Sequence, residues 1–182
     1  MRTSTRIFAG ITVAAALVLS GCNGGDSTEK PTETPTPTPT ADPAQEAQDE
    51  AFEAIKGMHK SFDDVAKDGW KDLGPLDDYA KGDVADAEKE FGTQYKEKGQ
   101  FGTGETVLSD YKASDVDVTE KSVDAKVCVD TTQRKLHNSD GSEVKLKPQI
   151  PLKAVKTYTV EFDQVKDKWM VVKYDSAGDE PC

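Results

Sequence analysis

The chain has 182 residues, and its 34 acidic residues outnumber its 23 basic residues, which gives a formal net charge of −11. A surface of that sign repels nucleic acid and anionic lipid headgroups, so we expect no nucleic-acid partner and no membrane attachment through charge. The three cysteines include no Cys-x-x-Cys pair, which argues against a dithiol redox site.

The first 22 residues have the pattern of an exported lipoprotein. Two arginines precede residues 7–19, which are almost uninterruptedly apolar, long enough for a signal peptide and too short to span a membrane. Residues 19–22, Leu-Ser-Gly-Cys, resemble a bacterial lipobox, in which signal peptidase cuts just before a cysteine that carries diacylglycerol. We expect residues 1–21 to be a signal peptide and Cys22 to hold the chain on the outer face of the cell membrane through its lipid. The alternative is a secretory peptide that is cut elsewhere and leaves Cys22 as a free thiol.

The next segment is predicted to be a disordered, Thr/Pro-rich stalk over residues 22–43. Residues 23–42 contain four prolines and no large apolar residue, so nothing offsets the entropy of ordering them. Alternating prolines favour an extended conformation. Loss of residues 1–21 leaves 21 basic and 34 acidic residues, a net charge of −13. A globular domain is expected over residues 44–182.

A long helix is expected to open the domain. Asp42 is placed to cap it, Pro43 to occupy its first position, and Gln45 to complete a capping box. We expect the helix to end near Gly69, and Gly57 within it to mark close packing. Apolar residues recur along it at spacings of three and four, and they are Phe52, Ile55, Met58 or His59, Phe62 and Val65.

A second helix is predicted after a turn-rich connection at residues 70–81. It should run from Asp83 to about Lys98, with Gly99 at its end. Its predicted inward face consists of Val84, Ala87, Phe91 and Tyr95. The glycine-rich residues 99–104 are predicted to be a loop, because they lead into a strand and so lack the helix N-terminus that would hold a phosphate.

After Gly104 the apolar period changes from 3.6 to 2, which predicts strands. Val123 to Val129 alternate cleanly with polar residues, and Asn138 to Gly141 are predicted to form a turn. The remaining strand candidates are residues 106–108, 116–118, 155–162 and 169–174. Helices followed by strands predict an α+β domain, in which two helices pack on an antiparallel sheet of about four strands.

The cysteines other than Cys22 offer one pairing. With Cys22 acylated, Cys128 and Cys182 remain, and an exported protein favours their oxidation to a disulfide. In the chain-entropy model such a bridge stabilises the domain by about 4 kcal/mol. We therefore expect a structural disulfide between Cys128 and Cys182.

The order of the elements resembles the nuclear transport factor 2-like, or cystatin-like, cone fold, and the chain is similar to short actinobacterial lipoproteins of that kind. The similarity covers residues 44–182. Besides the lipobox and the stalk, it rests on Cys128-Val129-Asp130 in the sheet, Trp169-Met170-Val171 on the last strand, and the terminal Cys182. It implies a curved sheet with a conical cavity against the first helix, used by family members for isomerase or dehydratase chemistry, for ligand binding, or as core.

Few residues are suited to acid–base chemistry. Enzymes with this fold use a buried Asp or an Asp–His pair inside the cone, and His59 and Asp130 are the weak catalytic candidates here. The alternative for His59 is a helix-flank histidine with one satisfied nitrogen, and for Asp130 a solvated residue or a hydrogen-bond partner for a loop. His137 is expected to be exposed. The sequence contains no zinc spacing or Walker loop, so we expect no metal and no cofactor.

Two functions from different classes remain open at this stage. The leading hypothesis is a surface-anchored, non-catalytic domain that binds a cell-wall protein, a membrane protein or a small apolar ligand. The alternative is a small exported enzyme of isomerase or dehydratase type. Four aromatic residues are possible pocket walls, although core positions are more usual for such residues, and they are Trp70, Tyr79, Tyr158 and Trp169.

Overall fold

The structure is a computed structural model that describes residues 42–145, 151–175 and 180–182. The predictions for the signal peptide, for Cys22 and for nearly all of the stalk therefore lie outside the described residues. The chain divides into two compact units after Thr38, and every described residue belongs to the second unit. No helix in the described ranges is long and apolar enough to cross a membrane.

The long helix α1 spans Pro43–Lys67 and begins as its sequence predicts. The side chain of Asp42 accepts a hydrogen bond from the amide of Ala44 at 3.0 Å, which satisfies one of the first-turn donors. The predicted capping box is wrong, because the side chain of Gln45 donates to Asp49 instead. Gly69 follows the helix with a φ of +71°, and this conformation, easy for glycine, ends it as expected.

A short 3-10 helix, η1 (Gly74–Asp77), connects α1 to the second helix, α2 (Asp83–Glu97). The predicted inward face of α2 is only partly right. Val84 and Tyr95 pack against the two core clusters, but Ala87 is exposed, Phe91 is 42% exposed, and the buried residues are Ala85 and Gly92. A Cβ atom on Gly92 would lie 2.8–2.9 Å from Leu73 and Trp70. Leu73 and Trp70 pack directly against the backbone of α2 at Gly92, and this contact determines which face of the helix turns inward. The spacing of apolar residues does not reveal such a contact.

The main sheet has four antiparallel strands in the order β2-β3-β5-β6. They are β2 (Val107–Asp117), β3 (Ser122–Asp130), β5 (Lys153–Asp163) and β6 (Lys168–Asp175). Two further strands pair in a separate small sheet, β1 (Phe101–Thr103) and β4 (Lys135–His137). Two helices on antiparallel sheets confirm the predicted α+β class.

Two strand predictions need correction. The candidates at residues 106–108 and 116–118 belong largely to the single strand β2, whose register shifts after Ser109 and after Ala113; such irregularities let a strand continue past residues that break the alternation. Part of the predicted glycine-rich loop forms β1, because it pairs with β4 far along the chain. The sequence around residues 99–104 gives no sign of this pairing, because β4 lies more than 30 residues further along the chain.

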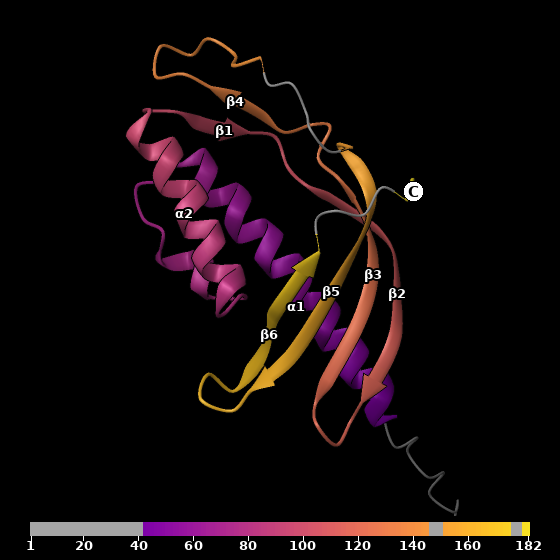
Figure 1. The fold of residues 1–182 in the computed structure, drawn as a ribbon. Helices are drawn as coiled ribbons and strands as arrows, with labels where there is room; N and C mark the ends of the chain where they lie inside the picture. The colour runs from indigo at the N-terminus through magenta and orange to yellow at the C-terminus, as the bar shows by residue number, and fades with distance from the viewer. Residues whose placement is uncertain (1–41, 146–150, 176–179) are drawn as a thin grey trace, which may run out of the picture. The chain divides into compact units, whose positions relative to one another are not determined.

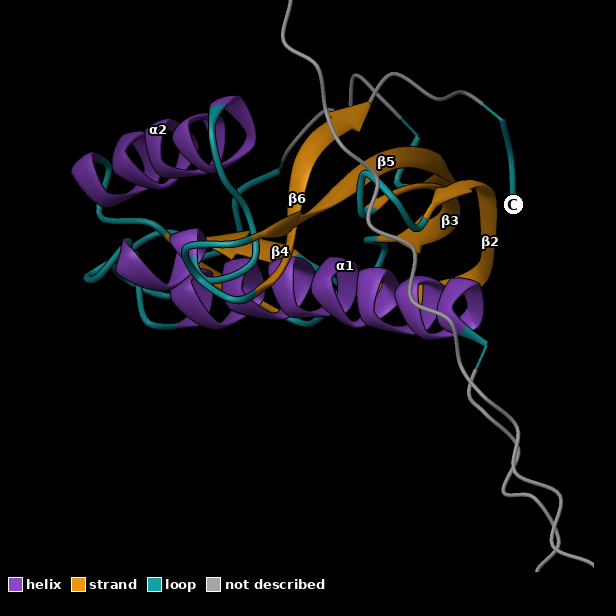
Figure 2. Ribbon diagram, turned by 90° about the horizontal axis from the view of Figure 1, so that it is seen from below, coloured by secondary structure: helices purple, strands orange, loops and turns teal. Residues whose placement is uncertain are grey.

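The four-stranded sheet curves around α1, which lies along one of its faces (Figures 1 and 2). Val123, Ala125, Val127 and Val129 of β3 are each at most 3% exposed, which confirms the predicted alternation. They form one core with buried residues of α1, β5 and β6, among them Ile55, Met58, Val160 and Val171. Trp70, Leu76, Val65 and Ala66 form a second buried cluster.

Cys128 and Cys182, the predicted pair, are joined at an S–S distance of 2.08 Å. Cys128 is 2% exposed although it lies on the opposite face of β3 from the valines. The last residues of the chain run beside β5, where the amide of Val155 donates to the carbonyl of Glu180 at 2.9 Å. The C-terminus is thereby attached to the middle of the main sheet.

Candidate functional site

His59 lies on the buried stripe of α1 and is 9% exposed. Its Nε2 atom is 2.8 Å from the hydroxyl of Tyr158, and the rings of Tyr158 and Tyr174 meet it edge-on. Burial, and to a smaller extent the charge of Arg134, lowers the pKa of His59 to about 4. His59 is therefore a neutral imidazole at pH 7, held by one hydrogen bond to a tyrosine.

The two tyrosines stack on one another, with ring centroids 5.0 Å apart and an interplanar angle of 24°. Burial raises the pKa of Tyr158, and the neighbouring Tyr174 adds to that increase. Burial raises the pKa of Tyr174 as well, opposed by the positive charge of Arg134. Both hydroxyls therefore keep their protons, and His59, Tyr158 and Tyr174 form a neutral polar cluster inside the domain.

An ion pair lies beside this cluster. Asp63 of α1 is 5% exposed and sits 3.2 Å from Nε of Arg134, which precedes β4. The amide of Thr106 also donates to Asp63, at 2.6 Å. Burial lowers the pKa of Arg134, whereas the charge of Asp63 opposes that shift. The guanidinium also lies over the ring of Phe62, 4.5 Å from its centroid, so the ion pair fixes the loop between β3 and β4 against α1.

Glu88 of α2 is the most perturbed carboxyl group of the domain. Burial raises its pKa to about 8, and the charge of Arg134 only partly opposes the shift. Its Oε2 atom is buried and has no hydrogen-bond partner among the described residues. Glu88 is therefore mostly protonated at pH 7, a state that suits a carboxyl group away from water.

Side chains fill the space between α1 and the curved sheet. Ile55, Met58, Val123, Val127 and Val160 are each at most 1% exposed there. These buried side chains thus fill the part of the conical cavity, implied by the resemblance, that lies between them. The buried residues His59 and Asp63 also line the larger of the two surface pockets described below, whereas Glu88, which is half-buried, lines neither.

Asp130 and His137 lie away from the interior cluster. Asp130 accepts hydrogen bonds from the hydroxyl and the amide of Thr132, and these bonds, more than the nearby Lys153, lower its pKa. It is a loop-fixing carboxylate and does not meet His59. His137 was expected to be exposed, but it is half-buried, because it stacks on Phe101 and bonds Thr103.

One surface pocket, of about 730 Å³, is lined mostly by α1, including the buried residues His59 and Asp63. Its charged side chains pair among themselves: Lys60 with Asp64, and Lys67 with Glu105 at 2.8 Å. Exposed pairs of this kind contribute little free energy and leave no net charge to attract a ligand. This pocket is therefore the weaker candidate for a binding site.

The other pocket, of about 450 Å³, has aromatic walls. Phe52 is held by stacking on Tyr111, with centroids 4.5 Å apart. Trp169 meets Phe162 edge-on and donates its indole N–H to Glu50. The walls are formed by Phe52, Tyr79, Phe162 and Trp169, and the charged residues around them are Asp49, Glu50, Glu53, Asp167 and Lys168.

Tyr79 reaches this pocket through a close contact with α1. A Cβ atom on Gly57 would lie 2.4 Å from the ring of Tyr79, a distance that only a glycine permits. The prediction that Gly57 marks close packing is confirmed. The absence of a side chain at this position brings the tyrosine from the connection before α2 onto the surface of α1.

The structure divides the four aromatic candidates between core and surface. Trp70 and Tyr158 are core, each 2% exposed, and Trp169 is core as well, at 7%, although it also lines the aromatic pocket. Tyr79 is partly buried and lines both pockets. Sequence reasoning missed Asp63, Glu88 and Arg134. Glu88 could have been found from its spacing. It lies three residues after Ala85 and four before Gly92, so it shares their face of the helix, and both of these small residues are buried.

Within the described ranges, no group of three or more His, Cys, Asp or Glu residues is placed to hold a metal ion. No protein-family model matches the chain, and no curated protein matches its sequence. The intermembrane space region of the chloroplast protein ARC6 aligns with 77% of this chain and 99% of its own, at 11% identity and a TM-score of 0.49. A de novo designed beta-sheet protein aligns with 70% of this chain and 87% of its own, at 16% identity and a TM-score of 0.30.

Proposed function

We propose that the chain is a lipoprotein held on the outer face of a bacterial cell membrane by a lipid on Cys22. The apolar residues 7–19, the Leu-Ser-Gly-Cys run at residues 19–22 and the proline-rich stalk support this proposal. The order of elements in residues 44–182 supports kinship with the nuclear transport factor 2-like superfamily.

The tethered domain, in this proposal, binds a ligand in the aromatic pocket and catalyses no reaction on it. The observation that carries the proposal is the gathering of Phe52, Tyr79, Phe162 and Trp169 on one surface pocket of about 450 Å³. Small-molecule sites are typically concave, largely apolar and about 300–1,000 Å³ in volume. Trp169 belongs to the main core and the other three rings pack against it, so the core holds the pocket wall in place, and four rings around one opening favour recognition.

The two tryptophans of the chain make the test direct. In the ¹⁵N-labelled full chain, the indole N–H signal of Trp169 reports on the aromatic pocket, while that of Trp70 reports on the second core cluster. Titration with small amphipathic compounds should shift the Trp169 signal in a saturable way and leave the Trp70 signal in place. If no compound moves the Trp169 signal, or if both signals move together, the binding proposal is wrong.

One observation favours the enzyme alternative. Glu88, with its pKa raised to about 8, is a carboxyl group suited to proton transfer near neutral pH, and Arg134 acts electrostatically on both Glu88 and His59. An isomerase or dehydratase of this kind would catalyse exchange of the α-proton of a carbonyl compound in D₂O, and Glu88→Gln would abolish that exchange. If the wild-type chain shows no exchange above the solvent rate with a panel of ketones and thioesters, the binding proposal stands alone.

A further inference from the structure

The aromatic pocket carries an excess of negative charge. Four carboxylates line it, with Lys168 as the one lining cation. Glu53 is ion-paired with Lys56 at 2.7 Å, whereas no ion pair is described for Asp49, Glu50 or Asp167. Glu50 accepts the indole N–H of Trp169. A ligand that enters this pocket therefore meets more lining carboxylates than lining ammonium groups, and aromatic rings at its walls.

The aromatic walls already interact with ammonium groups of the protein itself. Nζ of Lys168 lies 4.8 Å from the centroid of Tyr79, and Nζ of Lys121 lies 4.1 Å from that of Phe162. Nζ of Lys56 lies 5.5 Å from the centroid of Phe52. These distances are within the range of a cation–π interaction, which ends near 6 Å. Three of the four rings thus already carry an ammonium group of the protein, so they accept a cation, and a ligand cation has to displace these lysines.

We propose that the aromatic pocket binds a small aliphatic ammonium ion of the choline type. The inference rests on the proposed binding function and adds the chemical class of the ligand. The rings attract a cation through their quadrupoles and cover its alkyl groups, and the rim carboxylates supply charge complementarity. An anionic ligand is repelled by the same rim. The volume of about 450 Å³ suits a small molecule, and Lys168 occupies the face of Tyr79 until such a cation displaces it.

The test compares choline with its neutral carbon isostere, 3,3-dimethylbutan-1-ol, on the full chain. The two probes have the same shape and differ in charge, so the difference in affinity isolates the cation. Choline should shift the Trp169 indole signal with a Kd at least about fivefold lower than that of the isostere, and added salt should weaken choline alone.

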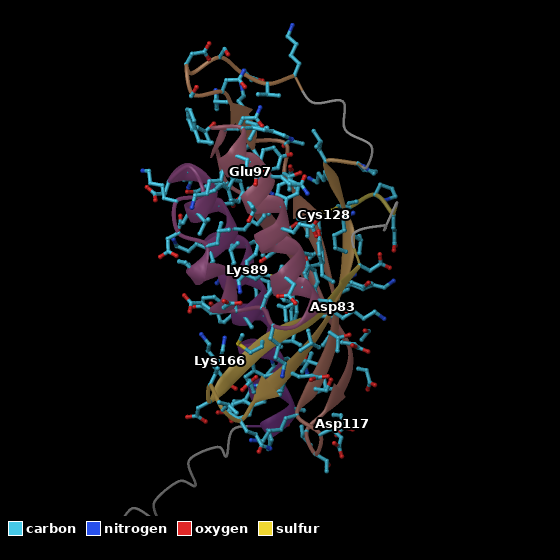
Figure 3. All side chains as sticks on the ribbon, turned by 60° about the vertical axis from the view of Figure 1, so that its left-hand side comes forward. Asp83, Lys89, Glu97, Asp117, Cys128 and Lys166 are labelled. Carbon is cyan, nitrogen blue, oxygen red and sulfur yellow. A yellow bond between two sulfur atoms is a disulfide. The ribbon has the colours of Figure 1, made fainter. Side chains whose placement is uncertain are left out.

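Three variants sharpen the assignment. Asp167→Asn removes one rim charge and keeps a residue that tolerates the positive φ of 53° at this position, so the Kd for choline should rise about threefold. Lys168→Met removes the resident ammonium from Tyr79 and should lower that Kd. The matched control is Glu97→Gln on α2, distant from the β5–β6 hairpin that carries Lys166 (Figure 3); it should leave choline binding unchanged.

The outcomes separate the ligand class from the binding function. If the isostere shifts Trp169 at the same concentrations as choline, the pocket binds and the ammonium assignment is overturned. If neither probe shifts Trp169 but another small amphipathic compound does, the ammonium assignment alone fails; if no compound shifts it, the proposed binding function fails as well. If N-acetyl-lysine methylamide binds more tightly than choline, the choline-type assignment is overturned, and the ligand is instead a lysine side chain of a protein partner. Equal affinity of the wild type and Asp167→Asn also contradicts the assignment.

Discussion

Glu88 and His59 are two interior groups whose pKa values move in opposite senses. The folded domain keeps Glu88 protonated up to about pH 8, whereas the unfolded chain releases that proton above about pH 4.5, so stability is lost as pH rises between these values. In the folded domain His59 stays neutral down to about pH 4, whereas in the unfolded chain it is protonated below pH 6.5. The domain therefore loses stability as the pH falls from 6.5 to about 4. Between pH 4.5 and 6.5 the two effects cancel.

The first prediction follows from this balance. The free energy of unfolding contributed by these two groups should be level from pH 4.5 to 6.5 and should fall by about 2 kcal/mol from pH 6.5 to 8, where Glu88 acts alone. Glu88→Gln has no proton to lose, so it should remove the fall above pH 6.5 relative to the wild type. Urea unfolding at pH 5, 6.5 and 8 measures the difference.

Glu97→Gln is the matched control for this experiment, because Glu97 is exposed near the end of the same helix. It should reproduce the wild-type dependence on pH. If Glu88→Gln keeps the same decline between pH 6.5 and 8 as the wild type, Glu88 does not hold a proton in the folded domain.

At the scale of elements, the contact between α1 and the connection before α2 depends on Gly57. Alanine at this position would gain about 1 kcal/mol of helix propensity, but its Cβ atom would lie 2.4 Å from the ring of Tyr79. We predict that Gly57→Ala lowers the free energy of unfolding by about 1–3 kcal/mol and shifts the Trp169 indole signal, because Tyr79 must leave the pocket wall. Denaturant unfolding and the indole spectrum check the two effects.

The exposed helical residue Gln94 provides the comparison for Gly57. Gln94→Ala should change the free energy of unfolding by less than about 0.5 kcal/mol and leave Trp169 unmoved. A Gly57→Ala variant that is more stable than the wild type would show that helix propensity, and not the contact with Tyr79, dominates at this position.

Elements with local signals could be predicted from the sequence, and elements that depend on distant partners could not. The start of α1 follows from Asp42 and Pro43, and the inward face of β3 follows from its alternating valines, because both patterns lie within a few residues. The pairing of β1 with β4 and the rotation of α2 depend on residues far apart in the chain. Apolar spacing therefore predicted the α+β class but only part of the inward face of α2, because it missed Ala85 and Gly92.

The candidate site was less predictable for the same reason. His59 and Trp169 attract attention in the sequence by residue type, but only the fold shows that both are buried and that they line different pockets. Glu88 looks like one of many acidic residues of a solvated helix until Ala85 and Gly92 are seen to face inward. The aromatic pocket combines α1, Tyr79 and the β5–β6 hairpin, and no single stretch of sequence contains it.

At the scale of the whole molecule, the bridge between Cys128 and Cys182 ties the C-terminus to the sheet across a sequence separation of 54 residues. We predict that Cys182→Ala lowers the free energy of unfolding by about 4 kcal/mol, because the unfolded chain without the bridge has a higher conformational entropy. Denaturant unfolding with and without reductant measures this loss.

Reductant is also the control for the bridge. It should bring the wild type to the stability of Cys182→Ala and should leave the variant unchanged. A wild type as stable in reductant as without it would contradict a stabilising role for the bridge.

The proposed lipid on Cys22 would anchor the whole molecule to the outer face of the membrane. Cell fractionation of the wild type and of Cys22→Ala tests it most directly, with mass spectrometry of the N-terminal peptide to identify the lipid. The account predicts that the wild type stays in the membrane fraction with a diacylglyceryl group on Cys22, and that the variant is released into the medium. A variant that stays in the membrane fraction, or a wild type that carries no lipid, would contradict the anchor.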